Sequence, residues 1–229
     1  MVILEPVKSK LATHELGDLL KRHEESIVIE PDCLYKQVTV KLWGNGVQLR
    51  DEILGSDIAA IKRVVVSPEQ FILSKIDARS GAMGVIPPDL DGAVVSNDFP
   101  VYEINRSVIL PEFLEILCKS GRLTALCKAA SEGTTNRVRL REERFLSSKI
   151  QLPSLSEQKS SVQSMQKIYE KVSVVKTLSL AIAKDLDEAL FHAYTKISEG
   201  VARQKMRKAA PLVRRTVLID PDASYPELG

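Results

Sequence analysis

The spacing of hydrophobic and polar positions changes along the chain, and this change predicts a strand-rich part followed by a helical part. Short β-branched or alternating segments predict strands at residues 38–43, 47–50, 58–66, 71–76, 84–86 and 93–104. Between the first two, Gly44-Asn45-Gly46 predicts a tight hairpin turn, because Asn and Gly adopt the left-handed backbone that such turns require. The first 150 residues are therefore expected to form an α+β domain with a mixed, strand-rich architecture.

Three shorter stretches with helical spacing fall within this strand-rich part. Residues 14–21 form an amphipathic pattern in which three leucines share one side. Residues 110–119 follow the same spacing, and Pro111 suits the first helical turn because an N–H has no helical partner there. Residues 122–130 predict a second helix directly afterwards. After a polar loop, residues 137–141 alternate strictly and predict one more strand.

A single long helix is predicted from Ser156 to about Ser198, because this stretch contains neither Pro nor Gly. Ser156 is a plausible N-cap, and a helix of this length would extend roughly 60–65 Å. One polar residue, Ser179, interrupts an otherwise apolar seam. The seam recurs at alternating spacings of three and four, through Met165, Ile168, Val172, Val175, Ile182, Leu186, Ala189 and Ala193. This heptad pattern predicts a coiled coil with a partner helix.

Three parts of the chain are predicted from these patterns, with a boundary at Leu152-Pro153. Residues 1–153 would form the strand-rich domain and residues 154–199 the long helix. Residues 200–229 would form a basic tail that three prolines interrupt, so it is expected to be flexible. The tail either contacts phosphate groups non-specifically or has no role. Its basic residues are Arg203, Lys205, Arg207, Lys208, Arg214 and Arg215.

Composition adds the constraint that any affinity for nucleic acid must come from local clusters of charge. The net charge of the 229 residues is only +2, with 44% hydrophobic and 27% charged residues. The three cysteines form no C-x-x-C pair, and the three histidines lack the spacing of metal ligands. The thiols are therefore expected to be unpaired in a reducing cytoplasm, and no metal site is expected.

Neither a signal peptide nor a membrane span is predicted. The first ten residues contain Glu5, Pro6 and two lysines, which do not fit a signal peptide. The longest apolar stretch, residues 178–183, lies between two lysines and is far too short to cross a bilayer. A cytoplasmic location is therefore expected.

A search for catalytic motifs gives weak candidates only. A methyltransferase needs a glycine-rich loop that leads into a helix, but Gly44-x-Gly46 leads into strand-like residues. Pro87-Pro88 lacks the preceding Asn or Asp, and the following aromatic residue, that would orient a target amine. Glu157-Gln158-Lys159 has the local form of a nuclease motif but no acidic partner at a suitable spacing. We therefore expect a chain that is not an enzyme and binds no cofactor itself.

The remaining candidate chemistry is a basic surface that suits DNA. On a strand, one face would carry Arg137, Arg139 and Arg141. Beside them lies the polar run Thr134-Thr135-Asn136. Arginine matches guanine edges and phosphates, and asparagine can pair with adenine. Lys75 and Arg79 form a second alternating candidate. The competing interpretation for both sets is an ordinary charged strand face.

Five segments together resemble the target-recognition domain of type I restriction–modification specificity subunits. The resemblance covers His14 to Ile197. Its segments are LGDLL (16–20), LSKIDARSGAMGV (73–85), LDGAVVSNDFPV (90–101), SEGTTNR (131–137) and I-x-L-P-x-L-x-E-Q (150–158). It implies a domain that reads double-stranded DNA, followed by a spacer helix. It also implies docking to a modification methyltransferase subunit that holds S-adenosylmethionine; whether a restriction subunit joins is left open.

The usual member of this family has two recognition domains and two helices that pair antiparallel, whereas this chain has one of each. The chain therefore looks like a half-length subunit or a fragment of a longer one. For the half-length form we expect dimerisation through the helix seam and reading of two inverted half-sites. The positions that contact bases differ between family members, so the candidates rest on charge and polarity. They are Lys75, Arg79, Asn97, Thr134, Thr135, Asn136, Arg137, Arg139 and Arg141. Two alternatives are a metal-dependent DNA nuclease and a scaffolding protein that oligomerises through the helix.

Overall fold

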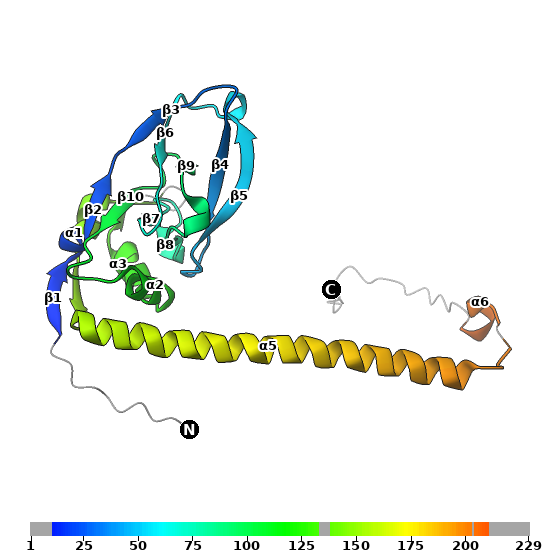
Figure 1. Cartoon of the computed structure of the whole chain (residues 1–229). Coiled ribbons are helices and arrows are strands. Elements are labelled where there is room, and N and C mark those ends of the chain that lie inside the picture. The colour runs from blue at the N-terminus through cyan, green and yellow to red at the C-terminus, as the bar shows by residue number, and fades with distance from the viewer. Residues whose placement is uncertain (1–10, 133–137, 203, 211–229) are drawn as a thin grey trace, which may run out of the picture. The chain divides into compact units, whose positions relative to one another are not determined.

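Two sheets organise the strand-rich part of the chain, and both are visible in Figure 1. The structure, a computed structural model, describes residues 11–132, 138–202 and 204–210. The chain divides into two compact units, Met1–Lys171 and Val172–Gly229. The strands are β1 (Ala12–Glu15), β2 (Leu20–His23), β3 (Ser26–Val28), β4 (Leu34–Val40), β5 (Val47–Leu54), β6 (Lys62–Val65), β7 (Phe71–Leu73), β8 (Met83–Val85), β9 (Val94–Val95), β10 (Val101–Ile104), β11 (Ser131–Glu132), β12 (Arg139–Leu140) and β13 (Lys149–Leu152).

Helices are interspersed among these strands up to β13, and only helices follow it in the part of the chain that the structure describes. They are α1 (Leu16–Leu19), α2 (Pro111–Lys119), α3 (Arg122–Ala129), α4 (Glu142–Leu146), α5 (Leu155–Ser198) and α6 (Met206–Ala209), and single 3₁₀ turns lie at Gly55–Asp57, Ala78–Ser80 and Pro88–Leu90. The predicted α2, α3 and α5 are confirmed, and Pro111 occupies the first turn of α2. The α+β architecture with a long helix after it is confirmed as well.

The larger sheet has the strand order β3-β6-β9-β4-β5. Its pairs are antiparallel except for the parallel pair of β4 and β9, so the sheet is mixed. The predicted pairing of the two strands is confirmed as the hairpin β4–β5, with positive φ at Gly44 and Gly46. The predicted tight turn at residues 44–46 is wrong, because β4 ends at Val40 and residues 41–46 form the connecting loop. Both of its strands are longer on the side away from the turn than predicted. Gly44 packs so closely that an added Cβ would lie 2.5 Å from the Cys118 backbone, so glycine is required there.

The smaller sheet has the antiparallel order β2-β10-β7-β8. Two predictions are wrong here. Residues 93–104 are not one strand, because the backbone turns between Ser96 and Phe99 and sends β9 and β10 into different sheets. Residues 14–21 are helical only in α1, because β2 pairs with β10 instead of extending the helix. In both cases pairing with a distant strand overrides local spacing.

Apolar side chains of the first unit form two buried clusters. One cluster lies between the two sheets and includes Val64, Ile72 and Val101. The other packs α1 to α4 against the smaller sheet and includes Phe71, Tyr102 and Phe145. Because both clusters contain residues of the smaller sheet, that sheet joins the larger sheet to the helices and provides a rigid base for the loops around it.

The first turn of α5 is fastened to the first unit by one buried side chain. Gln158 accepts a hydrogen bond from Leu110 N–H at 3.0 Å and donates to the carbonyl groups of Val108 and Pro153. The predicted N-cap, Ser156, is wrong. The helix begins one residue before it, and the Glu157 carboxylate accepts from the Ser154 N–H, as in a capping box, and also from the Ser154 hydroxyl.

The second unit contains the rest of α5 and the single-turn helix α6. Apolar residues of the predicted seam are exposed there, including Val175 at 63%, Ile182 at 66% and Leu186 at 57%. Ala189 is exposed as well, while Met165 and Ile168 precede this unit and are half-buried and exposed respectively. In the part of the chain that the structure describes, no helix combines the length and apolar character that a bilayer crossing requires.

Candidate nucleic-acid interface

Three segments that are distant in sequence lie side by side at one edge of the first unit. The N–H of Lys75 donates to the Asp98 carbonyl at 2.8 Å, and the Lys75 carbonyl accepts from the N–H of Leu140 at 2.9 Å. The segment after β7 is thereby held between the β9–β10 turn and strand β12. This arrangement brings together three of the predicted DNA contacts, namely Lys75, Asn97 and Arg139.

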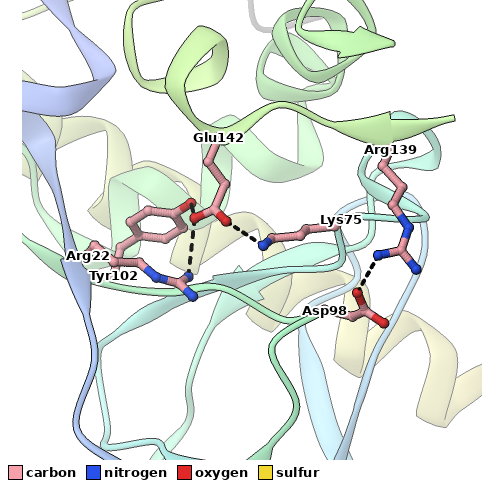
Figure 2. A network of polar contacts seen from close by, with 6 residues as sticks. All are labelled: Arg22, Lys75, Asp98, Tyr102, Arg139 and Glu142. Atoms are coloured by element: carbon pink, nitrogen blue, oxygen red, sulfur yellow. Dashed lines mark hydrogen bonds and ion pairs between the residues drawn. The ribbon is translucent and has the colours of Figure 1, made fainter. Parts of the chain in front are cut away.

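Arg139 lies at the centre of this edge and is paired with an acid. Its Nη1 donates to Asp98 Oδ1 at 2.9 Å, as Figure 2 shows, while 57% of its side chain remains exposed. Surface ion pairs of this kind contribute little to stability, so a phosphate group could replace the carboxylate at low cost. Asn97, next to Asp98, is exposed.

The predicted arginine strand is shorter than expected. Only Arg139 and Leu140 are in β12, because the chain leaves the strand at Arg141 and begins α4, which sequence spacing did not predict. Arg141 contacts Glu132 at 3.5 Å. The remaining candidates of this set, Thr134, Thr135, Asn136 and Arg137, lie outside the described residues.

Glu142, the first residue of α4, contacts three side chains that are distant in sequence: Arg22 of β2, Tyr102 of β10 and Lys75 after β7 (Figure 2). Lys75 Nζ lies 2.6 Å from its Oε1, and the Tyr102 hydroxyl donates to its Oε2 at 2.9 Å. Arg22 Nη1 lies 3.3 Å from the same Oε2, and its guanidinium sits 5.6 Å from the centre of the Tyr102 ring. This network ties α4, and with it the end of β12, to the smaller sheet.

The network changes the acidity of two of its members. Burial by itself raises the pKa of Glu142, but the hydrogen bonds from Lys75 and Tyr102 and the charge of Arg22 outweigh it, so the pKa is lowered. Burial, followed by the Glu142 charge, raises the pKa of Tyr102 well above its ordinary value. At neutral pH Glu142 is therefore an ionised carboxylate that accepts hydrogen bonds, and Tyr102 is a neutral phenol that donates one.

The charges around this edge are balanced. A pocket of about 420 Å³ is lined by three basic residues, Lys75, Arg141 and Arg144, and by three acidic ones, Glu132, Glu142 and Glu143. Arg144 also pairs with Glu132. Lys75, Arg139 and Arg141 are therefore each already paired with a carboxylate, which the sequence alone could not show because the pairing depends on the fold.

Arg79, the last described candidate, is exposed on the 3₁₀ turn Ala78–Ser80. It is close to Lys75 in sequence, but Lys75 lies within a turn from Ser74 to Ala78 and Arg79 follows that turn. The Ser74 hydroxyl accepts from the N–H of Asp77 at 3.1 Å, and its carbonyl accepts from the N–H of Ala78 at 2.8 Å. The predicted alternation of Lys75 and Arg79 along one strand is therefore wrong, because β7 ends at Leu73.

The cysteines offer no activated nucleophile at neutral pH. Burial raises the pKa of Cys118 well above its ordinary value and that of Cys127 to about 12. A hydrogen bond to Glu30 raises the pKa of Cys33, which is exposed. Across the described ranges, no three His, Cys, Asp or Glu side chains group as metal ligands would.

Comparisons with known proteins identify relatives of this fold. The family described as type I restriction modification DNA specificity domain matches residues 8–184. The HsdS subunit from Thermoanaerobacter tengcongensis is similar in structure, with a TM-score of 0.62 and 23% identity over 88% of this chain and 54% of that one. A structure of a type I R-M system, described for its complex assembly and conformational transition, is also similar. Its TM-score is 0.59, with 23% identity over 88% of this chain and 53% of that one.

A third similar structure is the type I restriction–modification S subunit from M. genitalium, with a TM-score of 0.51 and 11% identity over 86% of this chain and 49% of that one. At these identities the similarity establishes the fold. The chain spans about half the length of each of the three structures. No curated protein matched.

Proposed function

The chain belongs to the family of type I restriction–modification DNA specificity domains, and from this premise we propose that it reads a DNA sequence for a modification methyltransferase without transferring the methyl group itself. The observation that carries the proposal is the extent of the family match. Residues 8–184 include both the strand-rich domain and most of α5, so the match covers a recognition part and a spacer part together.

The proposed DNA contacts Arg139, Asn97 and Lys75 lie along the edge where the β9–β10 turn, the segment after β7 and β12 meet. Arg139 and Asn97 are exposed there and offer a guanidinium and an amide, the two groups best suited to guanine and adenine edges. We assign the same role to the other candidates, which are Arg79, Thr134, Thr135, Asn136, Arg137 and Arg141.

The proposed partner proteins are a second copy of this chain and a methyltransferase subunit that holds S-adenosylmethionine. The exposed seam of α5 supports self-association, because apolar residues repeat along it at coiled-coil spacing. Antiparallel pairing about a twofold axis would give a homodimer that reads two inverted half-sites. In this scheme residues 1–153 read DNA, residues 154–199 set the spacing, and residues 200–229 form a basic tail.

A reconstitution tests the proposal. The full chain is combined with its cognate modification subunit, S-adenosylmethionine and duplex DNA, and incorporated methyl groups are mapped by sequencing. We expect methylation at one sequence only when both proteins are present. Methyl transfer by the chain alone, or the same site pattern from the modification subunit alone, would contradict the proposal.

A further inference from the structure

A second polar surface lies on the larger sheet, beside the β9–β10 turn. Two pockets meet there, of about 290 and 190 Å³, and Arg63 of β6 lines both. Asn97 lines the first pocket, while its neighbour Asp98 holds Arg139. This turn therefore connects the Arg63 surface with the predicted DNA-contacting edge.

The charge of this surface differs from that of the edge containing Glu142. The residues around the two pockets include four cations, Arg22, Lys62, Arg63 and Arg50, but one carboxylate, Glu24. Arg50 already contacts Asp51 at 3.2 Å. Arg22 likewise contacts Glu142, which lines neither pocket, at 3.3 Å. Lys62 and Arg63 then remain against Glu24, so the surface keeps a small excess of positive charge and favours an anion.

Arg63 also has an unmet hydrogen-bonding requirement. Its Nε atom is buried and, within the described residues, has no hydrogen-bond partner. Arg22 Nη1, in the same pocket, likewise makes no hydrogen bond, although it lies 3.3 Å from a Glu142 oxygen. Buried donors without acceptors are costly, and guanidinium donors are best satisfied by the oxygens of a phosphate or carboxylate.

Strand pairing on both sides of β6 fixes the backbone of Arg63 and the face to which its side chain points. β6 pairs with β3 on one side, where Arg63 faces Ile27, and with β9 on the other. Val64, the next residue, is buried in the cluster between the sheets. Because successive strand residues point to opposite faces, Arg63 extends away from that cluster. The sheet thus fixes the face on which the Arg63 side chain leaves the backbone, away from the cluster between the sheets.

We propose that Arg63, with Lys62 and Arg22, binds a phosphodiester group of the DNA, so that the interface extends past Asn97 onto the larger sheet. A phosphate fits better than a base because Arg22, Lys62 and Arg63 all line the first pocket and the buried Nε of Arg63 needs an acceptor. The inference rests on the proposed function, since it takes duplex DNA as the ligand. It adds a site that the arginine pattern of the sequence did not indicate.

The test measures binding of the complex of the chain and its modification subunit to fluorescent duplexes, with and without the recognised sequence, from about 50 to 200 mM salt. Arg63→Gln should weaken binding to both duplexes by the same factor, roughly tenfold. The slope of log affinity against log salt should fall by about one unit. Lys62→Gln, an exposed and structurally mild change, should also lower the slope.

Arg106→Gln is the matched control. Arg106 is an exposed arginine that pairs with Glu69 and lines neither pocket, so its loss should leave affinity and slope unchanged. Arg63→Lys should retain most of the slope, and thermal unfolding verifies that each variant is folded.

The outcomes separate the two ideas. If the wild-type complex binds no duplex DNA, the proposed function and the phosphate site both fail. If it binds but Arg63→Gln and Lys62→Gln behave like Arg106→Gln, the phosphate site alone is wrong. Relaxed specificity at one base pair, with an unchanged salt slope, would overturn the phosphate assignment in favour of a base contact.

Discussion

The two units of this chain differ in the burial of their apolar residues. In the first unit, Phe71 and Tyr102 are fully buried in the cluster between the smaller sheet and helices α1 to α4. In the second, Ile182 and Leu186 of α5 are more than half exposed although they follow a regular seam. A buried core stabilises a domain by itself, whereas a regular exposed seam gains its free energy only from another surface. The difference distinguishes a domain that folds by itself from a helix whose apolar residues need a partner surface.

The largest expected effect on stability comes from a substitution in the buried core of the first unit. Phe71→Ala should lower the free energy of unfolding by about 3–5 kcal/mol, because it removes a fully buried ring and leaves a cavity. Ile182→Ala, at an exposed position, should change it by less than about 0.5 kcal/mol. Urea denaturation of the two variants at low protein concentration gives both values. Equal losses would mean that the seam belongs to the fold of the monomer.

The second prediction concerns the exposed seam of α5, where introduced charges should prevent self-association. Replacing Ile182 and Leu186 together with Glu should weaken self-association by roughly a hundredfold or more, since dimerisation would bury unpaired charges. Sedimentation should then show monomers, and circular dichroism should show an intact recognition domain. As a control, Lys184→Glu changes the charge of the same helix outside the seam and should leave the dimer intact. A wild-type chain that is monomeric both by itself and in the methyltransferase complex would contradict the homodimer.

A smaller effect is expected at the Glu142 network. Glu142→Gln should lower the free energy of unfolding by about 1 kcal/mol near neutral pH, because Lys75 and Arg22 lose their ionised partner. The pKa of Glu142 is lowered in the folded protein, so its contribution is present above the ordinary glutamate pKa and is lost as the pH falls through the folded value. The difference between wild type and variant should therefore shrink on acidification. A constant difference between about pH 7 and pH 3 would argue against this charge effect.

The smallest effect is expected on the exposed edge. Asp98→Asn leaves Arg139 without its carboxylate, so non-specific DNA binding should strengthen about two- to fivefold, in line with the small free energy of an exposed pair. The salt slope should rise as well. Arg106 pairs with Glu69, so Glu69→Gln offers a comparable change at an exposed pair that lines neither pocket, and it should leave DNA affinity unchanged. If Asp98→Asn leaves the affinity of every duplex unchanged, Arg139 does not face DNA.

Local patterns in the sequence predicted the features that depend on neighbouring residues. The β4–β5 hairpin, helices α2 and α3, and the uninterrupted α5 follow from turn chemistry and periodicity. The division of residues 93–104 between two sheets did not, because it depends on pairing with strands distant in sequence.

The same limit applies to the candidate site. The sequence identified Arg139 and Arg141 as basic residues but could not show that Asp98 and Glu132 face them. It also missed Arg63, which has no alternating basic neighbours and whose position follows from strand pairing on both sides of β6. A basic pair at the start of a short strand, Lys62-Arg63, was the only local signal.

The central claim is that the chain reads DNA sequence, and selection from random duplexes tests it most directly. The complex of the chain with its modification subunit is incubated with a pool of random-sequence duplex DNA, and bound molecules are enriched and sequenced. We predict that one motif emerges, made of two inverted half-sites separated by a fixed number of unread base pairs, and that it is absent when the modification subunit is used alone. Bound DNA with no enriched sequence, or the same motif without the chain, would contradict the claim.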